Sequence, residues 1–179
     1  MRVIAGSARG TKLVCPEGLS VRPTHDRVKE AVFSMLTGRL VGASVLDLFT
    51  GTGALSVEAL SRGAENAVLV DASARSLETA KANLEKTRLL DKARLVKADY
   101  LSFLQSTADQ FDLIFLDPPY QGDYLKKALE AIKSYQLLKA DGIIYCETEG
   151  EPPAEAAALF QVVRDKKYGR ARVLLLKEL

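Results

Sequence analysis

The sequence predicts an α/β protein built on a mostly parallel, Rossmann-like sheet. From residue 44 onward, short apolar segments alternate with helical segments, which is typical of strand–helix–strand crossover units. Strand segments such as 113–116 and 143–145 are continuously apolar, as expected for a sheet covered by helices on both faces. We expect seven strands, the last antiparallel, in a single domain of residues 1–179. Residues 1–40 form an extension of a β-hairpin and a helix, and 41–179 form the Rossmann-like core.

The elements of this fold can be assigned in order. Residues 2–14 contain two short strand segments around a turn with Gly6 and Gly10, a pattern compatible with a hairpin. Apolar residues at helical spacing then predict a helix over 25–37, with Thr24 as its N-cap. Core strands are expected at 45–49, 67–71, 93–97, 112–117, 142–147, 160–165 and 171–176. Helices are expected at 54–62, 74–87, 99–106 (a short helix or a turn), 123–135 and 154–159.

The composition is that of an ordinary globular protein, with 47% hydrophobic and 27% charged residues among 179. No apolar run approaches the ~18 residues of a membrane-spanning helix. The first residues lack the long apolar core of a secretory signal. Cys15 and Cys146 have neither metal-ligand spacing nor disulfide density, so we expect a cytoplasmic protein without membrane contact or metal.

The charges are distributed unevenly along the chain. Residues 1–40 carry seven basic and three acidic residues (+4), residues 41–163 twelve and eighteen (−6), and residues 164–179 six and two (+4). Basic segments are the expected footprint of phosphate contacts, although charged, solvated surface explains them equally well. We expect the two basic ends to meet on one face of the domain.

A glycine-rich turn at 45–53 ends a strand and opens a helix. Gly51 and Gly53 remove Cβ atoms where the backbone must approach a ligand, although a tight turn also needs glycine for local reasons. Ser56 stands where a dinucleotide-binding fingerprint has its third glycine. Asp47 would repel a pyrophosphate but suits a cationic group, such as the amino group or sulfonium of S-adenosylmethionine. The turn therefore favours that cofactor over NAD.

Two further carboxylates follow the next strands. Asp71 can accept hydrogen bonds from both ribose hydroxyls, and its alternative role is an acid at a helix N-terminus. Asp99 can accept from the adenine amino group, or it can be an N-cap. The candidate cofactor-binding residues at this end are Asp47, Phe49, Thr50, Gly51, Gly53, Asp71, Ala72, Asp99 and Tyr100.

The sequence Asp117-Pro118-Pro119-Tyr120 follows the fourth strand and is the candidate catalytic motif. The exocyclic amine of a base is a poor nucleophile because its lone pair is delocalised into the ring. The Asp117 carboxylate and the Pro118 carbonyl can accept both N–H groups and aim the lone pair at a methyl donor. The prolines fix the backbone, and Tyr120 can stack on the base. A rigid turn after a strand is the alternative interpretation.

The chain also resembles a known family over nearly its whole length. The stretches that carry the resemblance are 2–6, 9–13, Arg22-Pro23-Thr24, 26–33, 46–49 with Gly51, 53–55, 58–64, 111–120 and Lys167-Tyr168-Gly169. In these stretches it resembles the RsmD-type 16S ribosomal RNA (guanine-N2) methyltransferases of bacteria. The family usually has a bulky residue near position 8 and Ala and Ser at 50 and 52, where this chain has Ala8, Thr50 and Thr52.

The resemblance implies methylation of one specific guanosine in small-subunit ribosomal RNA, within a partly or fully assembled subunit. It also implies that Arg22 and Thr24 lie near the cofactor. Candidate RNA-binding residues are Arg9, Lys12, Arg27, Lys166, Lys167, Arg170 and Arg172. A monomer is the default expectation.

Two other functions are compatible with these residues. An adenine-N6 methyltransferase would use the same motif, because Asp-Pro-Pro-Tyr serves either amine. A ribosome-assembly factor could bind RNA without catalysis, although the intact Asp117 and the glycine-rich turn argue against it.

Overall fold

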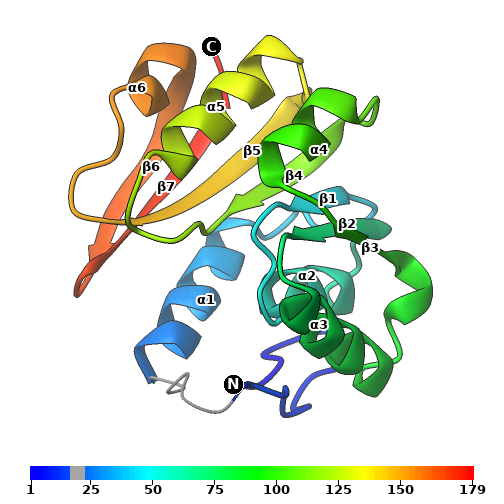
Figure 1. Ribbon diagram of the computed structural model, residues 1–179. Coiled ribbons are helices and arrows are strands. Elements are labelled where there is room, and N and C mark those ends of the chain that lie inside the picture. The colour runs from blue at the N-terminus through cyan, green and yellow to red at the C-terminus, as the bar shows by residue number, and fades with distance from the viewer. Residues whose placement is uncertain (17–22) are drawn as a thin grey trace.

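The computed structural model describes residues 1–16 and 23–179, and within them it contains a seven-stranded sheet (Figure 1). The strand order is β3-β2-β1-β4-β5-β7-β6. β7 is antiparallel to both of its neighbours, and the other pairings are parallel. The strands are β1 (Ser44–Asp47), β2 (Asn66–Asp71), β3 (Ala93–Lys97), β4 (Phe111–Leu116), β5 (Leu138–Glu149), β6 (Phe160–Tyr168) and β7 (Ala171–Glu178). The predicted Rossmann-like fold is confirmed.

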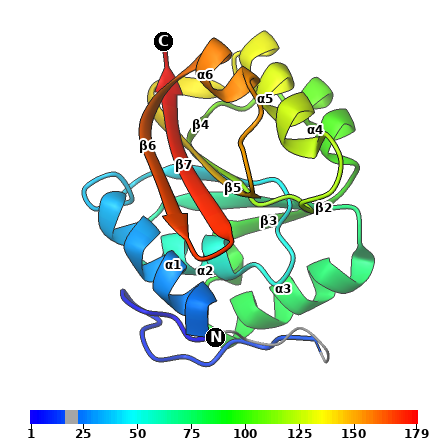
Figure 2. The same ribbon diagram turned by 90° about the vertical axis from the view of Figure 1, so that its left-hand side faces the viewer.

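Helices cover the sheet on both faces, as Figures 1 and 2 show. α1 (Pro23–Met35), α2 (Ala54–Ser61) and α3 (Ala74–Lys86) lie on one face, and α4 (Tyr100–Ser106), α5 (Tyr124–Ser134) and α6 (Glu155–Leu159) on the other. A short 3-10 turn, η1 (Leu90–Lys92), precedes β3. Two apolar cores result, one beneath each helical layer.

Neighbouring residues of each central strand belong to opposite cores. Leu113 packs toward α1–α3 and Ile114 toward α4–α6, and the same alternation holds for Ile143 and Ile144. Successive side chains of a strand point to opposite faces, so a continuously apolar strand supplies both cores. The apolar runs that predicted these strands therefore have a direct structural cause.

The strand ends differ most from prediction at β5, which runs from Leu138 to Glu149 instead of 142–147, and next in the C-terminal hairpin. β6 extends to Tyr168 and β7 to Glu178, beyond the predicted ends at 165 and 176. β6 is an edge strand whose residues from Gln161 to Lys167 are exposed, so the ladder to β7 continues through charged positions. An apolar pattern marks a strand only where a side chain is buried.

The N-terminal segment is not the predicted two-stranded hairpin. One bridge joins Arg2 to Lys12, and three backbone hydrogen bonds flank it, which is too little for a strand assignment. α1 begins at Pro23, so Thr24 lies in its first turn rather than at the predicted N-cap.

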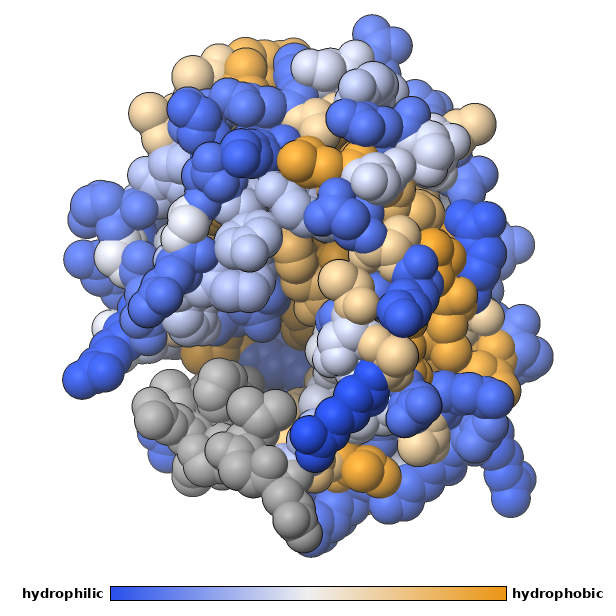
Figure 3. Space-filling view, viewed as in Figure 1, coloured by the Kyte–Doolittle hydropathy of each residue, from blue (hydrophilic) through white to orange (hydrophobic). Residues whose placement is uncertain are grey.

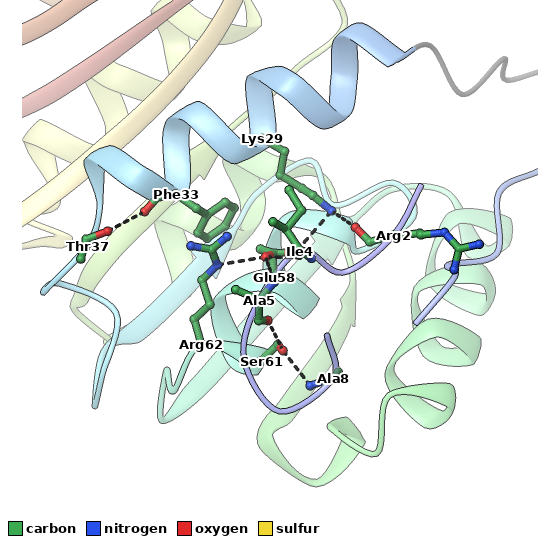
Figure 4. A network of polar contacts seen from close by, with 10 residues as sticks. All are labelled: Arg2, Ile4, Ala5, Ala8, Lys29, Phe33, Thr37, Glu58, Ser61 and Arg62. Atoms are coloured by element: carbon green, nitrogen blue, oxygen red, sulfur yellow. Dashed lines mark hydrogen bonds and ion pairs between the residues drawn. The ribbon is translucent and has the colours of Figure 1, made fainter. Parts of the chain in front are cut away.

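The N-terminal segment is instead held by side chains of α2 (Figure 4). Glu58 is fully buried and accepts hydrogen bonds from the backbone N–H groups of Ile4 and Ala5 at 3.0 and 3.1 Å. Its carboxylate also lies 3.3 Å from the Lys29 ammonium and 2.9 Å from the Arg62 guanidinium. This one carboxylate therefore joins α1 and the N-terminal segment to α2.

None of the described helices is long and apolar enough to cross a membrane.

Candidate active site

The predicted site residues lie at the carboxyl-terminal edge of the sheet, where the chain order reverses between β1 and β4. Open α/β sheets bind ligands in the crevice at this switch point. A cavity of about 520 Å³ opens there, and Figure 3 shows a hollow with apolar residues in its wall on this side of the molecule. The cavity is lined by Leu48, Phe49, Gly51, Asp71, Ala72, Ala98, Asp99, Tyr100, Tyr124 and all four residues of the Asp-Pro-Pro-Tyr motif.

The two glycines of the turn serve different purposes. Gly51 has a φ of +52°, and a Cβ placed on it would enter open space beside the cavity. Gly53 has a φ of +76°, and a Cβ there would come within 3.0 Å of the Ala80 side chain. Gly51 leaves room for a ligand, whereas Gly53 permits close packing of the turn on α3. Packing on α3 therefore explains the glycine at position 53, and the contact of Gly53 with the cofactor stays a prediction.

Asp47 lies behind the turn instead of on the cavity wall. It is 2% exposed, and its Oδ2 atom accepts hydrogen bonds from the hydroxyls of Thr50 at 2.9 Å and Ser56 at 2.8 Å. Burial raises the pKa of this carboxyl to about 6. Ser56, at the position of the third glycine, thus orients Asp47. The direct contacts of Asp47 and Thr50 with the cofactor stay predictions.

The carboxylates after β2 and β3 both reach the cavity. Asp71 accepts hydrogen bonds from the backbone N–H groups of Gly51 at 3.0 Å and Ser73 at 2.8 Å. Asp99 is the N-cap of α4, and its Oδ2 accepts from the N–H groups of Leu101 and Ser102. Within the described chain, the Oδ1 atom of Asp99 has no hydrogen-bond donor, so it can serve as a cap and a ligand acceptor at once.

Three aromatic rings form one side of the cavity. The centroids of Phe49 and Tyr100 are 5.1 Å apart, and Tyr124 lies 6.1 Å from Phe49 and 5.6 Å from Tyr100. These separations are typical of favourable aromatic pairs. Tyr124 was not predicted, since nothing in the sequence of α5 distinguishes its first residue from other exposed tyrosines.

The Asp-Pro-Pro-Tyr motif forms the rim between this cavity and two smaller ones. Asp117 is partly buried and Pro118 is buried, while Pro119 and Tyr120 are exposed. Burial and the neighbouring carboxylates of Glu147 and Asp47 raise the pKa of Asp117 well above its ordinary value. An acceptor with a strongly perturbed pKa at a cavity wall is a typical feature of an active site.

Glu147 and Tyr145, at the end of β5, were not predicted to belong to the site. Glu147 is 7% exposed and accepts hydrogen bonds from the hydroxyls of Tyr145 at 2.6 Å and Tyr120 at 3.2 Å. It lines a cavity of about 280 Å³ together with Thr50, Asp117 and Tyr145. Its position one strand from Asp117 is a consequence of sheet order, which the sequence alone did not reveal.

The basic residues proposed for RNA binding fall into three groups. Arg9, Lys12 and Arg27 are exposed, as are Lys166, Lys167 and Arg170 near the β6–β7 turn. Arg172 differs, because it forms ion pairs with Asp165 and Glu151, both at 2.7 Å. These ion pairs offset its charge, and its contact with an RNA phosphate stays a prediction. Arg22 and the side chain of Thr24 lie outside the described residues.

The hairpin turn and the N-terminal region lie on the same side of the molecule (Figures 1 and 2). Tyr168 packs on the apolar core to which Val3 and Val28 contribute. Ala8, where the family usually has a bulky residue, is buried, and its N–H donates to Ser61 Oγ at 2.9 Å. Position 8 therefore belongs to the anchor of the N-terminal segment in this chain.

A further cavity, of about 560 Å³, opens at the opposite edge of the sheet. It is lined by mostly polar residues, including Ser44, Asp91 and Lys139, and by none of the motif residues. Among the described residues, the glycine-rich turn and the Asp-Pro-Pro-Tyr motif both lie at the carboxyl-terminal edge.

This fold, the ligand-sized cavity at its switch point and the Asp-Pro-Pro-Tyr motif define the class of S-adenosylmethionine-dependent methyltransferases. Residues 1–177 match the family described as "Conserved hypothetical protein 95". The chain belongs to this RsmD-type family of methyltransferases.

Individual relatives agree with this assignment. "Ribosomal RNA small subunit methyltransferase D" of Escherichia coli K12 is 36% identical over 151 residues, covering 84% of this chain and 76% of the relative. YlbH of Bacillus subtilis, whose name gives rRNA methyltransferase as a provisional assignment, is 39% identical and covers 99% of both chains. The solved structure of TTHA0928 from Thermus thermophilus matches with a TM-score of 0.81 at 27% identity, covering 99% of both chains.

The cavity fits the cofactor that the family uses. The Asp71 and Asp99 carboxylates offer acceptors for ribose hydroxyls and an adenine amine, and the Phe49 and Tyr100 rings offer a flat apolar wall. The missing Cβ of Gly51 leaves space between these groups. The individual cofactor contacts remain predictions.

Proposed function

We propose that this enzyme transfers a methyl group to the exocyclic N2 atom of a specific guanosine in 16S ribosomal RNA. The observation that carries the proposal is the Asp117–Tyr120 motif between two cavities at the carboxyl edge of the sheet. The names of the E. coli and Haemophilus influenzae relatives, 36% and 33% identical, support ribosomal RNA of the small subunit as the substrate.

The catalytic work proposed for the chain is positioning. Asp117 accepts one N–H of the target amine and the Pro118 carbonyl accepts the other, so the nitrogen lone pair points toward the cofactor cavity. When bound, the cofactor supplies a methyl group on a positively charged sulfur. Tyr120 is 44% exposed and offers a ring face on which the base stacks.

The cofactor site proposed here combines Asp71, Asp99 and the aromatic wall with Asp47 as a buried counter-charge. Burial is the main cause of the raised pKa of Asp47 and Asp117, and repulsion from nearby carboxylates adds to it, from Asp71 at Asp47 and from Glu147 and Asp47 at Asp117. A cationic ligand relieves that repulsion, so the site favours a positively charged cofactor over a pyrophosphate.

The RNA is proposed to approach from the side that carries both basic ends. Lys166, Lys167 and Arg170 lie near the turn after β6, and the start of β7 pairs with the end of β5, whose Glu149 is two residues from Glu147. The hairpin therefore extends the surface next to the motif.

The enzyme is proposed to act as a one-domain monomer in the cytoplasm, on a partly or fully assembled subunit.

The proposal is tested by methyl transfer from labelled S-adenosylmethionine to small ribosomal subunits that lack this modification, followed by nucleoside analysis. Label in N2-methylguanosine is the expected result. Label in N6-methyladenosine would replace guanine by adenine as the substrate. Cofactor binding without any labelled RNA would contradict this substrate and favour an assembly factor.

A further inference from the structure

The carboxylate of Glu147 is buried beside the catalytic motif. Its oxygens accept hydrogen bonds from the Tyr145 and Tyr120 hydroxyls. In the described part of the chain, no Lys, Arg or His nitrogen lies within 4.0 Å of these oxygens. A charged group is rarely this buried unless it is paired, and the Glu147 oxygens keep acceptor sites that a donor of a ligand can occupy.

The sheet register brings Glu147 next to Asp117. Leu116 of β4 pairs with Cys146 of β5 in parallel register, so the two acids follow this pair on neighbouring strands. Parallel strands lie about 4.8 Å apart. Phe115 and Tyr145 point to the α1–α3 face, and the alternation of a strand gives the residues two further on the same face. Asp117 and Glu147 thus line the same 280 Å³ cavity on the α1 side.

Two adjacent acceptors match the Watson–Crick edge of guanine. That edge presents two neighbouring donors, N1–H and the N2 amine, whereas adenine presents an amine beside N1, which is an acceptor. Enzymes that extrude a base read it by hydrogen bonds to this edge. An acceptor facing N1 therefore binds guanine and repels adenine.

We infer that Glu147 reads the N1–H group of the target guanine and sets the choice of guanine over adenine, while Asp117 holds the N2 amine. This inference rests on the proposed function. Each carboxylate oxygen has two acceptor sites, so Glu147 can take a further hydrogen bond while both tyrosines remain bound. The two hydroxyls fix the direction of the carboxylate, and the ring of Tyr120 places the base against it.

The competing explanation is that Glu147 only positions Tyr120. A positioning role affects every base that stacks on Tyr120 by a similar factor. If Glu147 reads N1–H, its replacement should change the rates for two bases by different factors when the bases differ at N1. The two explanations are separated by 2-aminopurine, which keeps the N2 amine but has an acceptor at N1 instead of N1–H.

The test compares small subunits reconstituted with ribosomal RNA that carries either guanine or 2-aminopurine at the modified position. The wild-type enzyme is expected to prefer guanine. In Glu147→Gln the side-chain amide can donate to N1 of 2-aminopurine, so the ratio of kcat/KM for guanine over 2-aminopurine is expected to fall by about 100-fold, because a polar partner is lost for one base and gained for the other. Tyr145→Phe is the matched control: it removes one of the two hydroxyls that orient this carboxylate but keeps the carboxylate itself, so the ratio should fall far less than in Glu147→Gln.

Equal losses on both substrates in Glu147→Gln would overturn the inference and leave Glu147 as a positioning residue. The thermal midpoint and the cofactor affinity of both variants show whether they are folded. A wild-type enzyme that binds cofactor but methylates neither base refutes the proposed function itself, which is a different result from an unchanged ratio.

Discussion

Two groups of buried carboxylates in this protein are neutralised in different ways. Glu58 is surrounded by Lys29, Arg62 and two backbone N–H groups, and every element that it touches is part of the scaffold. Among the described residues, no Lys, Arg or His forms an ion pair with Asp47, Asp117 or Glu147, and burial together with nearby carboxylates raises the pKa of the two aspartates. The first arrangement is complete in the free protein. We propose that a ligand completes the second, so that the kind of partner, more than burial alone, distinguishes the carboxylates of the site from those of the scaffold.

The largest effect is expected for Asp117→Ala. Removal of the acceptor for the target amine should lower the methyl-transfer rate by about 10³-fold, as loss of a preorganised transition-state contact does in other enzymes. Because the change removes a partly buried carboxylate that forms no ion pair with the described residues, the thermal midpoint should not fall. A single-turnover assay with labelled cofactor measures the rate. A rate near that of the wild type in Asp117→Ala would refute the mechanism. Asp117→Asn keeps one acceptor oxygen, so its methyl-transfer rate should fall less.

The reverse result is expected for Glu58→Gln. This change leaves the Lys29 ammonium, which is 5% exposed, without its carboxylate and should destabilise the protein by about 3–5 kcal/mol. Urea denaturation measures the free energy of unfolding. Glu85→Gln is the control, because the Lys81–Glu85 pair is exposed and should contribute about 0.5 kcal/mol or less. If both variants lost a similar free energy of unfolding, the buried Glu58 cluster would stabilise the protein no more than an exposed ion pair does.

A smaller, pH-dependent effect is expected for Asp47→Asn. The folded-state pKa of about 6 lies above the unfolded value of 3.8, so the native state binds the extra proton between these pH values. Wild-type stability should therefore decrease as pH rises from about 4 to 6, by about 2–3 kcal/mol in total, and stay lower above pH 6. Asparagine can still accept from the Thr50 and Ser56 hydroxyls, so the variant should be the more stable protein at pH 8. Denaturation curves at pH 8 and pH 5 test this, and an advantage that does not shrink at pH 5 would contradict it.

The smallest effect is expected at the hairpin. Lys167→Ala combined with Arg170→Ala should raise KM for subunits and reduce the slope of log KM against log salt by about 1–2, since each phosphate contact contributes nearly one unit. Arg172→Gln should leave this slope unchanged because Asp165 and Glu151 already neutralise Arg172. Kinetics at several KCl concentrations measure both. An equal change for Arg172 would show that its ion pairs open when RNA binds.

Much of the fold was predictable because its signals are local. The apolar runs of β4 and β5 belong to strands buried on both faces. Gly51 lies in the turn between β1 and α2, and Gly63 follows the end of α2. The predictions failed where burial was incomplete. The exposed residues of β6 carry no apolar pattern, and residues 2–12 form one bridge although their composition resembles a hairpin.

The amino-acid sequence by itself determined the class of the protein, because the glycine-rich turn and the Asp-Pro-Pro-Tyr motif each bring their groups together within a few residues. Only the tertiary structure decided which acids belong to the scaffold and which to the site. Glu58 meets Ile4 across 54 residues and Glu147 meets Tyr120 across 27. Contacts over such separations depend on sheet order and helix packing, and a carboxylate has the same local pattern whether its partner is a lysine or a substrate.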